Sequence, residues 1–368
     1  MTLNSISFEA AQQLVVLYGG TLMGGGTIDG KPVRHSTIKE YLREAGAYLT
    51  SIGFRKLDPC KQEDDQEKWF GPLGRMLDDF KRWESEPNRV SPLTCRMVRS
   101  LQRMIVDLPE GKVWTDSKLH AFNDWCIVGL NMGYRKCEWA VDTAPKDLAS
   151  YPLHHADHEG DKGYYNCIGT DFRICDTNGL PIPIEQEDCW PIDQIGASTA
   201  KVRWQKNGHN NVELSFARNP KNPSFDVPMA MLRIKQRARR LGLRSDQPLS
   251  GYRASRNSQR PSFFCNNTIK GMLQMMASNT YDIPIDQLAE YGLRYTGHSF
   301  RVGAAVLMHA NGAKEDEIKQ RLRWTSACYA LYLRQMPKDA INHMRMFNNS
   351  DVDDWDPSHM TEPTMVTV

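Results

Sequence analysis

The fold of this chain is decided by residues 297–334, GHSFRVGAAVLMHANGAKEDEIKQRLRWTSACYALYLR. Its pattern predicts three short helices. The first covers 298–310 and ends at an Asn-Gly pair, which is typical of a left-handed helix stop. The second covers 314–322 and has acidic residues in its first turn, where they suit the positive end of the helix dipole. The third covers 326–335 and ends before a proline.

The polar and aromatic side chains of this stretch form an unusual set. His298 and Arg301 are three residues apart on one predicted helix, so they share a face. Trp324 falls at the turn after the second helix. Tyr329 and Tyr332 are also three residues apart, and Tyr332 is followed by a leucine and an arginine. A histidine and an arginine on one face, followed by a tryptophan and then by a tyrosine close to an arginine, are an uncommon combination.

In this order, His298-x-x-Arg301, Trp324 and Tyr332-Leu-Arg resemble the catalytic half of the tyrosine recombinases, the phage-integrase family. The resemblance is closer to recombinases of eukaryotic mobile elements, the DIRS-like and Crypton-like enzymes, which share the step of eight residues between Trp324 and Tyr332. It implies that Tyr332 is the nucleophile, with Tyr329 as the alternative. It also implies that His298 handles the tyrosine proton and that the indole of Trp324 donates to a phosphate oxygen.

Cleavage of a phosphodiester by a tyrosine has further requirements. The charge on the nonbridging oxygens must be neutralised, a base must take the phenol proton, and an acid must protonate the leaving oxygen. Two guanidiniums can hold the phosphate without a metal, since each offers a planar fork. Arg301 is one of them. We therefore expect no cofactor and no metal.

The resemblance also implies the remaining catalytic residues. Gly133-x-Arg135-x-x-Glu138 is similar to the motif that carries the first arginine of the family, in which the glutamate is mainly structural. Arg135 is therefore the expected second guanidinium. The catalytic lysine of the family lies in a β-hairpin, and Lys206 lies in a predicted hairpin turn, so we expect Lys206 to be the general acid. Lys201 is the alternative.

The length of 368 residues is sufficient for two domains. The pattern predicts a mainly α protein with a small β-hairpin or sheet. The resemblance implies an N-terminal helical core-binding bundle and an α+β DNA breaking-rejoining catalytic domain. We place the DNA-clamping domain, with an irregular N-terminus, at 1–107, a linker at 108–118, the catalytic domain at 119–345 and a polar tail at 346–368.

Local patterns predict the elements of these domains. Helices are expected from Ser36 or Thr37 to near Gly53, and over 74–83, 94–106, 119–130, 229–241 and 268–277. A Lys-Asn-Gly turn between 201–204 and 212–216 predicts a β-hairpin. The acidic stretch before it contains prolines and glycines and is expected to form short strands and loops.

Composition excludes several classes of protein. Hydrophobic residues make up 40% of the chain and the mean hydropathy is −0.55, values typical of a globular protein. No apolar run approaches the roughly 20 residues of a membrane helix, and the N-terminus lacks the pattern of a signal peptide. The nine cysteines are scattered, which favours reduced thiols. His154, His155 and His158 lie close together, but we interpret them as part of a polar loop rather than a metal site.

Charge is unevenly distributed, although the net charge is only +2. Residues 199–260 contain 14 lysines and arginines and three acidic residues, whereas residues 150–198 contain nine acidic residues and two basic ones. The basic block suits phosphate contacts. The alternative is a solvated charged face, and the role of the acidic segment is left open.

The expected function is therefore a site-specific DNA recombinase or integrase that works through a 3′-phosphotyrosine. The resemblance implies double-stranded DNA as the partner and a homotetramer on two DNA sites, with no membrane. The expected location is the nucleus in a eukaryote and the cytoplasm otherwise. Two alternatives are a non-catalytic DNA-binding protein derived from such an enzyme, and a type IB topoisomerase-like enzyme. The latter would work as a monomer on one duplex.

Overall fold

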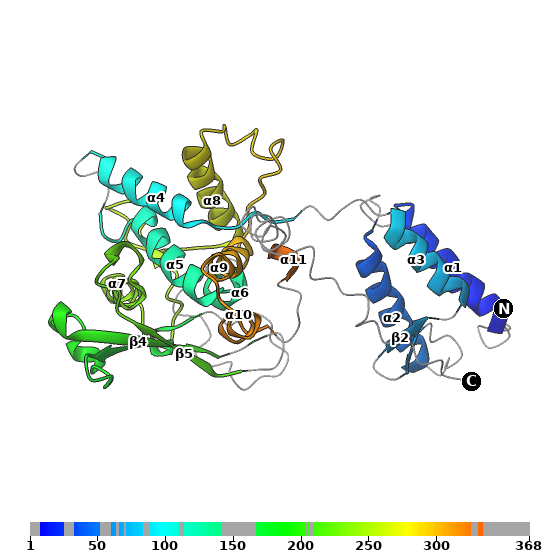
Figure 1. The fold of residues 1–368 in the computed structure, drawn as a ribbon, viewed down its shortest axis with the longest axis horizontal. Helices are drawn as coiled ribbons and strands as arrows, with labels where there is room; N and C mark the ends of the chain where they lie inside the picture. The colour runs from blue at the N-terminus through cyan, green and yellow to red at the C-terminus, as the bar shows by residue number, and fades with distance from the viewer. Residues whose placement is uncertain are drawn as a thin grey trace, which may run out of the picture. The chain divides into compact units, whose positions relative to one another are not determined.

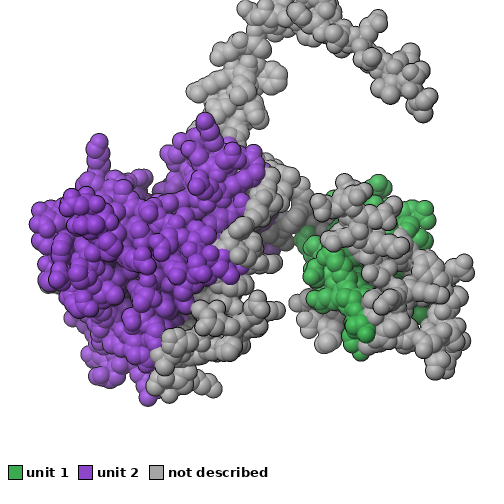
Figure 2. All heavy atoms as spheres, turned by 90° about the horizontal axis from the view of Figure 1, so that it is seen from below, with its two compact units in different colours: residues 1–87 green, residues 88–368 purple. Residues whose placement is uncertain are grey.

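The computed structural model describes residues 8–25, 33–51, 60–63, 66–69, 71–83, 89–109, 114–141, 167–203, 205, 210–324 and 330–333. The chain divides into two compact units, residues 1–87 and 88–368 (Figure 2). Each unit has its own apolar core. Among the described helices, none combines the length and the apolar character that crossing a membrane requires.

The first unit contains three helices and a short antiparallel hairpin: α1 (Phe8–Met23), α2 (His35–Ser51), β1 (Cys60–Glu63), β2 (Gln66–Trp69) and α3 (Gly71–Trp83). Its helices bury apolar side chains that recur one turn apart, such as Ile38 and Leu42 on α2 and Leu73 and Leu77 on α3. The predicted helices at 36–53 and 74–83 are confirmed. α1 and the hairpin were not predicted.

The second unit contains the remaining elements (Figure 1): α4 (Cys95–Asp107), α5 (Lys118–Met132), α6 (Lys136–Trp139), η3 (Gly169–Asp171), β3 (Phe172–Asp176), η4 (Ile184–Gln186), η5 (Ile192–Gln194), β4 (Ile195–Val202), β5 (Val212–Ala217), η6 (Pro223–Phe225), α7 (Val227–Arg240), β6 (Gly251–Tyr252), β7 (Ser262–Phe263), α8 (Asn266–Tyr281), α9 (Ser299–Ala310), α10 (Glu315–Leu322) and α11 (Ala330–Leu333). The unit is mainly helical with a small antiparallel sheet, as the sequence predicts.

Helix α5 is the centre of the second unit, because it packs against α4, α7 and α9 (Figure 1). Its N-cap is Ser117, and its aromatic side chains Phe122 and Trp125, three residues apart, are buried in one aromatic cluster. Trp125 stacks on Trp139 with ring centroids 4.8 Å apart, and Phe122 meets Phe300 of α9 edge-on at 6.0 Å. These contacts join α5, α6 and α9 into one rigid core.

The structure corrects the predicted domain boundary. The sequence analysis assigned residues 94–106 to the N-terminal domain, whereas α4 packs against α5 and α8 and belongs to the second unit, which begins at Asn88. Met97, Val98 and Leu101 of α4 are fully buried in the core of that unit. The amphipathic pattern predicted the helix correctly, but it does not identify which core the apolar face covers.

The sheet of the second unit has the order β3-β4-β5, and both pairings are antiparallel. The predicted hairpin is confirmed, with Val202 opposite Val212 next to its turn. β4 begins earlier than predicted, because Gly196, Ala197 and Ser198 near its start are small residues that carry little strand signal. Helix α7 packs against all three strands (Figure 1).

The three C-terminal helices lie where they were predicted. α9 ends before Gly312, which has a φ of 85°. At the start of α10, the Glu317 carboxylate accepts a hydrogen bond of 2.6 Å from the Lys314 backbone N–H. α11 packs against α9. Only residues 330–333 of the third predicted helix lie among the described residues.

Candidate functional site

The end of helix α5 brings three distant segments together. Gly133 has a left-handed backbone, with φ of 56°, and caps α5 through a hydrogen bond to Gly129. A methyl of Leu322 lies 2.6 Å from where a Cβ on Gly133 would be, so any side chain there would be strained and would displace Leu322. The Gly133 carbonyl accepts a hydrogen bond of 3.0 Å from the guanidinium of Arg301. This contact places the end of α5 beside α9 and α10.

Arg301 lies beneath the surface of this site, with 1% of the residue exposed. Its guanidinium donates to the carbonyls of Gly133 and Arg323, and it lies over the face of Trp324 at 4.5 Å from the ring centroid. A cation over an indole ring is an attractive contact. Arg301 and Trp324, two of the residues predicted from the sequence to be catalytic, are therefore in direct contact.

Arg135 is the N-cap residue of α6 and is held by Glu138. The carboxylate of Glu138 accepts from the Arg135 guanidinium at 2.9 Å and from its backbone N–H at 2.9 Å. The Arg135 side chain is 22% exposed, whereas that of Glu138 is 2% exposed. Arg135 therefore has a partly exposed side chain whose guanidinium and backbone are both held by the buried Glu138. The prediction that the glutamate is structural agrees with these contacts.

His298 begins α9 next to both arginines. Burial lowers the pKa of His298, and the positive charges of Arg301 and Arg135 lower it further. Close packing supports this proximity, because a Cβ on the neighbouring Gly297 would lie 2.8 Å from the side chain of Lys136. A lowered pKa keeps the imidazole neutral near pH 7, so it can accept a proton.

Of the six residues predicted to be catalytic, Lys206 and Tyr332 have side chains that lie outside the described part of the structure. Lys206 follows Gln205, whose backbone N–H donates to the side chain of Asn210 at 2.7 Å across the hairpin end. Tyr332 lies in α11, and its neighbour Leu333 packs against the same small cluster as Trp324. Tyr329 also lies outside the described residues, so the choice between the two tyrosines remains a prediction.

Arg323, which follows α10, was missed by the sequence analysis. It is buried, with φ of 58°, and its guanidinium forms an ion pair of 2.8 Å with Glu138. Sequence patterns could not identify it, because a left-handed position ordinarily signals itself by glycine or asparagine. Its place directly before Trp324 is the one indication that the sequence contains.

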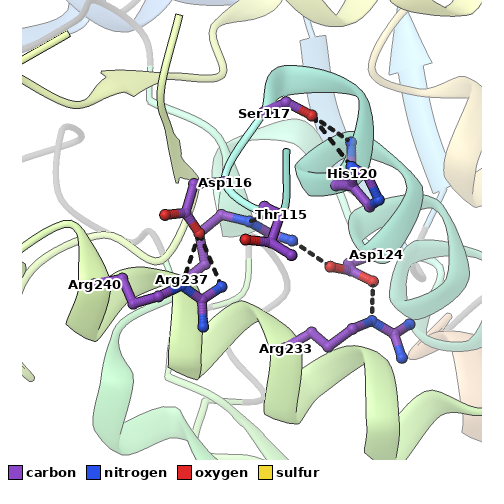
Figure 3. A network of polar contacts seen from close by, with 8 residues as sticks. All are labelled: Thr115, Asp116, Ser117, His120, Asp124, Arg233, Arg237 and Arg240. Carbon is purple, nitrogen blue, oxygen red and sulfur yellow. Dashed lines mark hydrogen bonds and ion pairs between the residues drawn. The ribbon is translucent and has the colours of Figure 1, made fainter. Parts of the chain in front are cut away.

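The basic block is mostly compensated inside the protein. Asp124 on α5 accepts from Arg233 at 2.7 Å and also from Arg237, while Asp116 pairs with Arg240 at 2.8 Å (Figure 3). The members of the block with a carboxylate partner are Arg203, Arg218, Arg233, Lys235, Arg237, Arg239, Arg240, Arg244 and Arg253. Nine of the 14 basic residues of this block therefore have a carboxylate partner within the fold. That the block contacts phosphate stays a prediction.

The acidic segment supplies several of those partners. Glu187 pairs with the buried Lys235 and with Arg239, and Asp171 pairs with Arg203 at 3.0 Å. Burial lowers the pKa of Lys235, and the carboxylate of Glu187 opposes that shift. The described part of this segment therefore stabilises α7 and the sheet by charge pairing. Residues 142–166, which include the three clustered histidines, lie outside the described residues. Within the described residues no group of three or more potential ligands is arranged to hold a metal ion.

No protein-family profile and no curated protein matches this sequence. Among solved structures, the Tn1549 transposon integrase in complex with circular intermediate DNA is 15% identical, with a TM-score of 0.39 over 92% of this chain and 85% of that chain. A variant of that integrase with transposon right-end DNA is 13% identical, with a TM-score of 0.45 over 95% of this chain and 87% of that chain. The XerA recombinase is 12% identical, with a TM-score of 0.36 over 93% and 90% of the two chains. Because these TM-scores are below 0.5, we base the function on the geometry of the site.

Proposed function

We propose that this protein is a tyrosine-type DNA recombinase, which cleaves and rejoins double-stranded DNA through a 3′-phosphotyrosine intermediate. One observation carries the proposal: Arg135, His298 and Arg301 come together from distant segments, and Arg301 lies against Trp324. Two guanidiniums and a neutral imidazole are what metal-free cleavage of a phosphodiester needs around the phosphorus. Tyr332 lies on a helix that packs beside them.

Each residue has a role in the proposed reaction. The phenol oxygen of Tyr332 attacks the scissile phosphorus and His298 accepts its proton. Arg135 and Arg301 neutralise the nonbridging oxygens, and the indole N–H of Trp324 donates to one of them. The bond to the 5′-oxygen breaks, and Lys206 gives that oxygen a proton. In rejoining, a 5′-hydroxyl attacks the phosphotyrosine and releases Tyr332, so no external energy source is required.

The proposal extends to assembly and biological role. Recombination exchanges strands between two duplexes, so we propose that four copies act together on two DNA sites, as the resemblance of the C-terminal residues implies. The same resemblance supports integration of a mobile element as the biological context, and the nucleus as the location if the host is a eukaryote.

A selection for covalent adducts tests the proposed function. The purified chain is incubated with a library of random-sequence duplexes, quenched with detergent, and the DNA that stays attached to protein is sequenced. We expect recovered duplexes to share a site, with DNA joined to protein through the 3′-phosphate. DNA binding without any adduct would favour the non-catalytic alternative. Relaxation of supercoiled DNA by a monomer, without strand exchange, would favour the topoisomerase-like one.

A further inference from the structure

Arg323 occupies a backbone position that an arginine rarely adopts. It ends α10 with φ of 58° and ψ of 47°, in the left-handed region. Residues other than glycine are strained in this region, because their Cβ comes too close to the backbone. The Arg323 side chain is nonetheless directed inward and only 3% exposed. A strained, buried arginine beside a site of charged residues requires a reason beyond ending a helix.

The contacts of Arg323 connect it to both guanidiniums of the proposed site. Its side chain reaches Glu138 at 2.8 Å, and the same carboxylate holds Arg135 at 2.9 Å. Its backbone carbonyl accepts from the Arg301 guanidinium at 3.4 Å. The guanidinium of Arg323 also lies 5.8 Å from the ring centre of Tyr134. One residue therefore contacts Arg301 directly and Arg135 through Glu138.

The charges of Arg135, Glu138 and Arg323 explain why these contacts matter for binding a phosphate. Glu138 is buried and carries one negative charge. If Arg135 were its sole cationic partner, the pair would be neutral and Arg135 would offer little attraction to a phosphate. With Arg323 as a second partner, the three residues carry a net positive charge, and Arg301 adds another. A phosphodiester gains negative charge as the tyrosine attacks, so this excess stabilises the transition state.

We propose that Arg323 is a positioning residue that compensates Glu138, so that the charge of Arg135 is available to the scissile phosphate. This inference rests on the proposed function. Arg323 does not itself touch the DNA. It acts by holding the carboxylate that fixes Arg135, and by offering the carbonyl that orients Arg301.

Arg323→Gly tests this role, because glycine adopts the left-handed backbone without strain and keeps the carbonyl that accepts from Arg301. Asp282→Gly is the matched control, since Asp282 caps α8 with φ of 58° and ψ of 42° and is exposed. Melting temperatures, DNA affinity and single-turnover rates of adduct formation are measured on the duplex recovered by the selection described above. Asp282→Gly should cleave at the wild-type rate.

Two substrates separate a charge effect from a general loss of structure. One carries the natural scissile phosphate, and the other a methylphosphonate, in which a methyl group replaces one nonbridging oxygen and removes the negative charge. We expect Arg323→Gly to slow adduct formation about 100-fold on the phosphate and less than about 10-fold on the methylphosphonate. Slowing by the same factor on both substrates, or no slowing, would overturn the role of Arg323.

A double variant tests whether Arg323 compensates the charge of Glu138. It is compared with Glu138→Gln alone, so the test applies even if Arg323→Gly by itself melts below the assay temperature. Glu138→Gln removes the negative charge that Arg323 compensates. Arg323→Gly combined with Glu138→Gln should therefore cleave at least about 10-fold faster than Arg323→Gly, and within about threefold of Glu138→Gln alone. A double variant far slower than Glu138→Gln alone would contradict the proposal. If the wild-type chain forms no adduct on either substrate, the proposed function fails instead.

Discussion

The guanidinium of Arg301 donates a hydrogen bond of 3.0 Å to the carbonyl of Gly133, a residue 168 positions earlier in the chain. This bond joins the beginning of α9 to the end of α5 and brings the segment that carries Arg135 next to His298. The left-handed conformation of Gly133 directs that carbonyl, and a side chain at this position would be strained and would displace Leu322. The positions of the proposed catalytic residues therefore depend on the backbone turn at Gly133, which takes no part in the proposed reaction.

Arg301→Lys should nearly abolish cleavage. Lysine retains the positive charge but lacks the planar fork, so it cannot hold two carbonyls and a phosphate in one geometry. We expect a loss of about 100-fold or more in single-turnover adduct formation, with DNA affinity changed less than about threefold. Arg244→Lys, at an exposed pair with Asp246, is the control and should have no effect. Cleavage at the wild-type rate by Arg301→Lys would remove Arg301 from the site.

The protein should still form adducts at pH values below the ordinary pKa of histidine, about 6.5, because His298 stays neutral there. Burial and the two arginines lower its pKa, so the imidazole still accepts a proton as the pH falls through that value. Adduct formation measured from pH 8 to pH 5 should decline only at the acidic end. A decline centred above about pH 6.5 would contradict this role.

The same shift affects stability in a defined direction. Between about pH 6.5 and the lower pKa of folded His298, the unfolded chain binds more protons than the folded chain, so stability falls as the pH falls. Above about pH 6.5 neither state takes up this proton. The wild type should therefore lose more melting temperature than His298→Gln between pH 7.5 and pH 5.5. Equal losses in the two proteins would show that His298 is not perturbed.

Asp124→Asn should destabilise the second unit strongly. Asp124 is 1% exposed and holds Arg233 and the buried Arg237 on α7 (Figure 3). Loss of its charge leaves a buried guanidinium without compensation, which costs about 3 kcal/mol of unfolding free energy. Asp246→Asn, at an exposed pair, should cost less than about 0.5 kcal/mol. Urea denaturation measures both, and equal effects would contradict the structural role of Asp124.

Lys206 is tested by changing the leaving group. An alkoxide leaves poorly, whereas a thiolate leaves easily because a thiol has a pKa of about 8.5. On a duplex whose 5′-bridging oxygen is replaced by sulfur, Lys206→Ala should recover most of the rate that it loses on normal DNA. Arg135→Ala should not recover, because its charge acts on the nonbridging oxygens. If sulfur fails to restore Lys206→Ala, Lys201 becomes the residue to test.

Local signals in the sequence were sufficient for most helices and for the hairpin. Asn311-Gly312 and the acidic first turn of α10 fixed two boundaries correctly, because capping depends on neighbouring residues alone. The partner of α4 could not be predicted in this way. Its apolar stripe would suit the core of either unit, and the choice depends on α5 and α8, which follow it in the chain.

The ion pairs between distant residues were the main feature that could not be predicted from the sequence. Asp124 and Arg237 are 113 residues apart, and nothing in their local context links them. A count of basic residues over 199–260 therefore indicated a surface for phosphate, although much of that charge is paired within the fold. The proximity of His298, Arg301 and Arg135 was anticipated from their resemblance to a known order of residues. Arg323 was not, since its role depends on a backbone angle.

The most direct test of the central claim is to identify the amino acid that becomes linked to DNA. The chain is trapped on a nicked duplex of the selected sequence, digested with protease, and the DNA-linked peptide is sequenced by mass spectrometry. We predict a phosphotyrosine at Tyr332, bonded to a 3′-phosphate and absent in Tyr332→Phe. An adduct on Tyr329, or one that persists in Tyr332→Phe, would contradict the assignment.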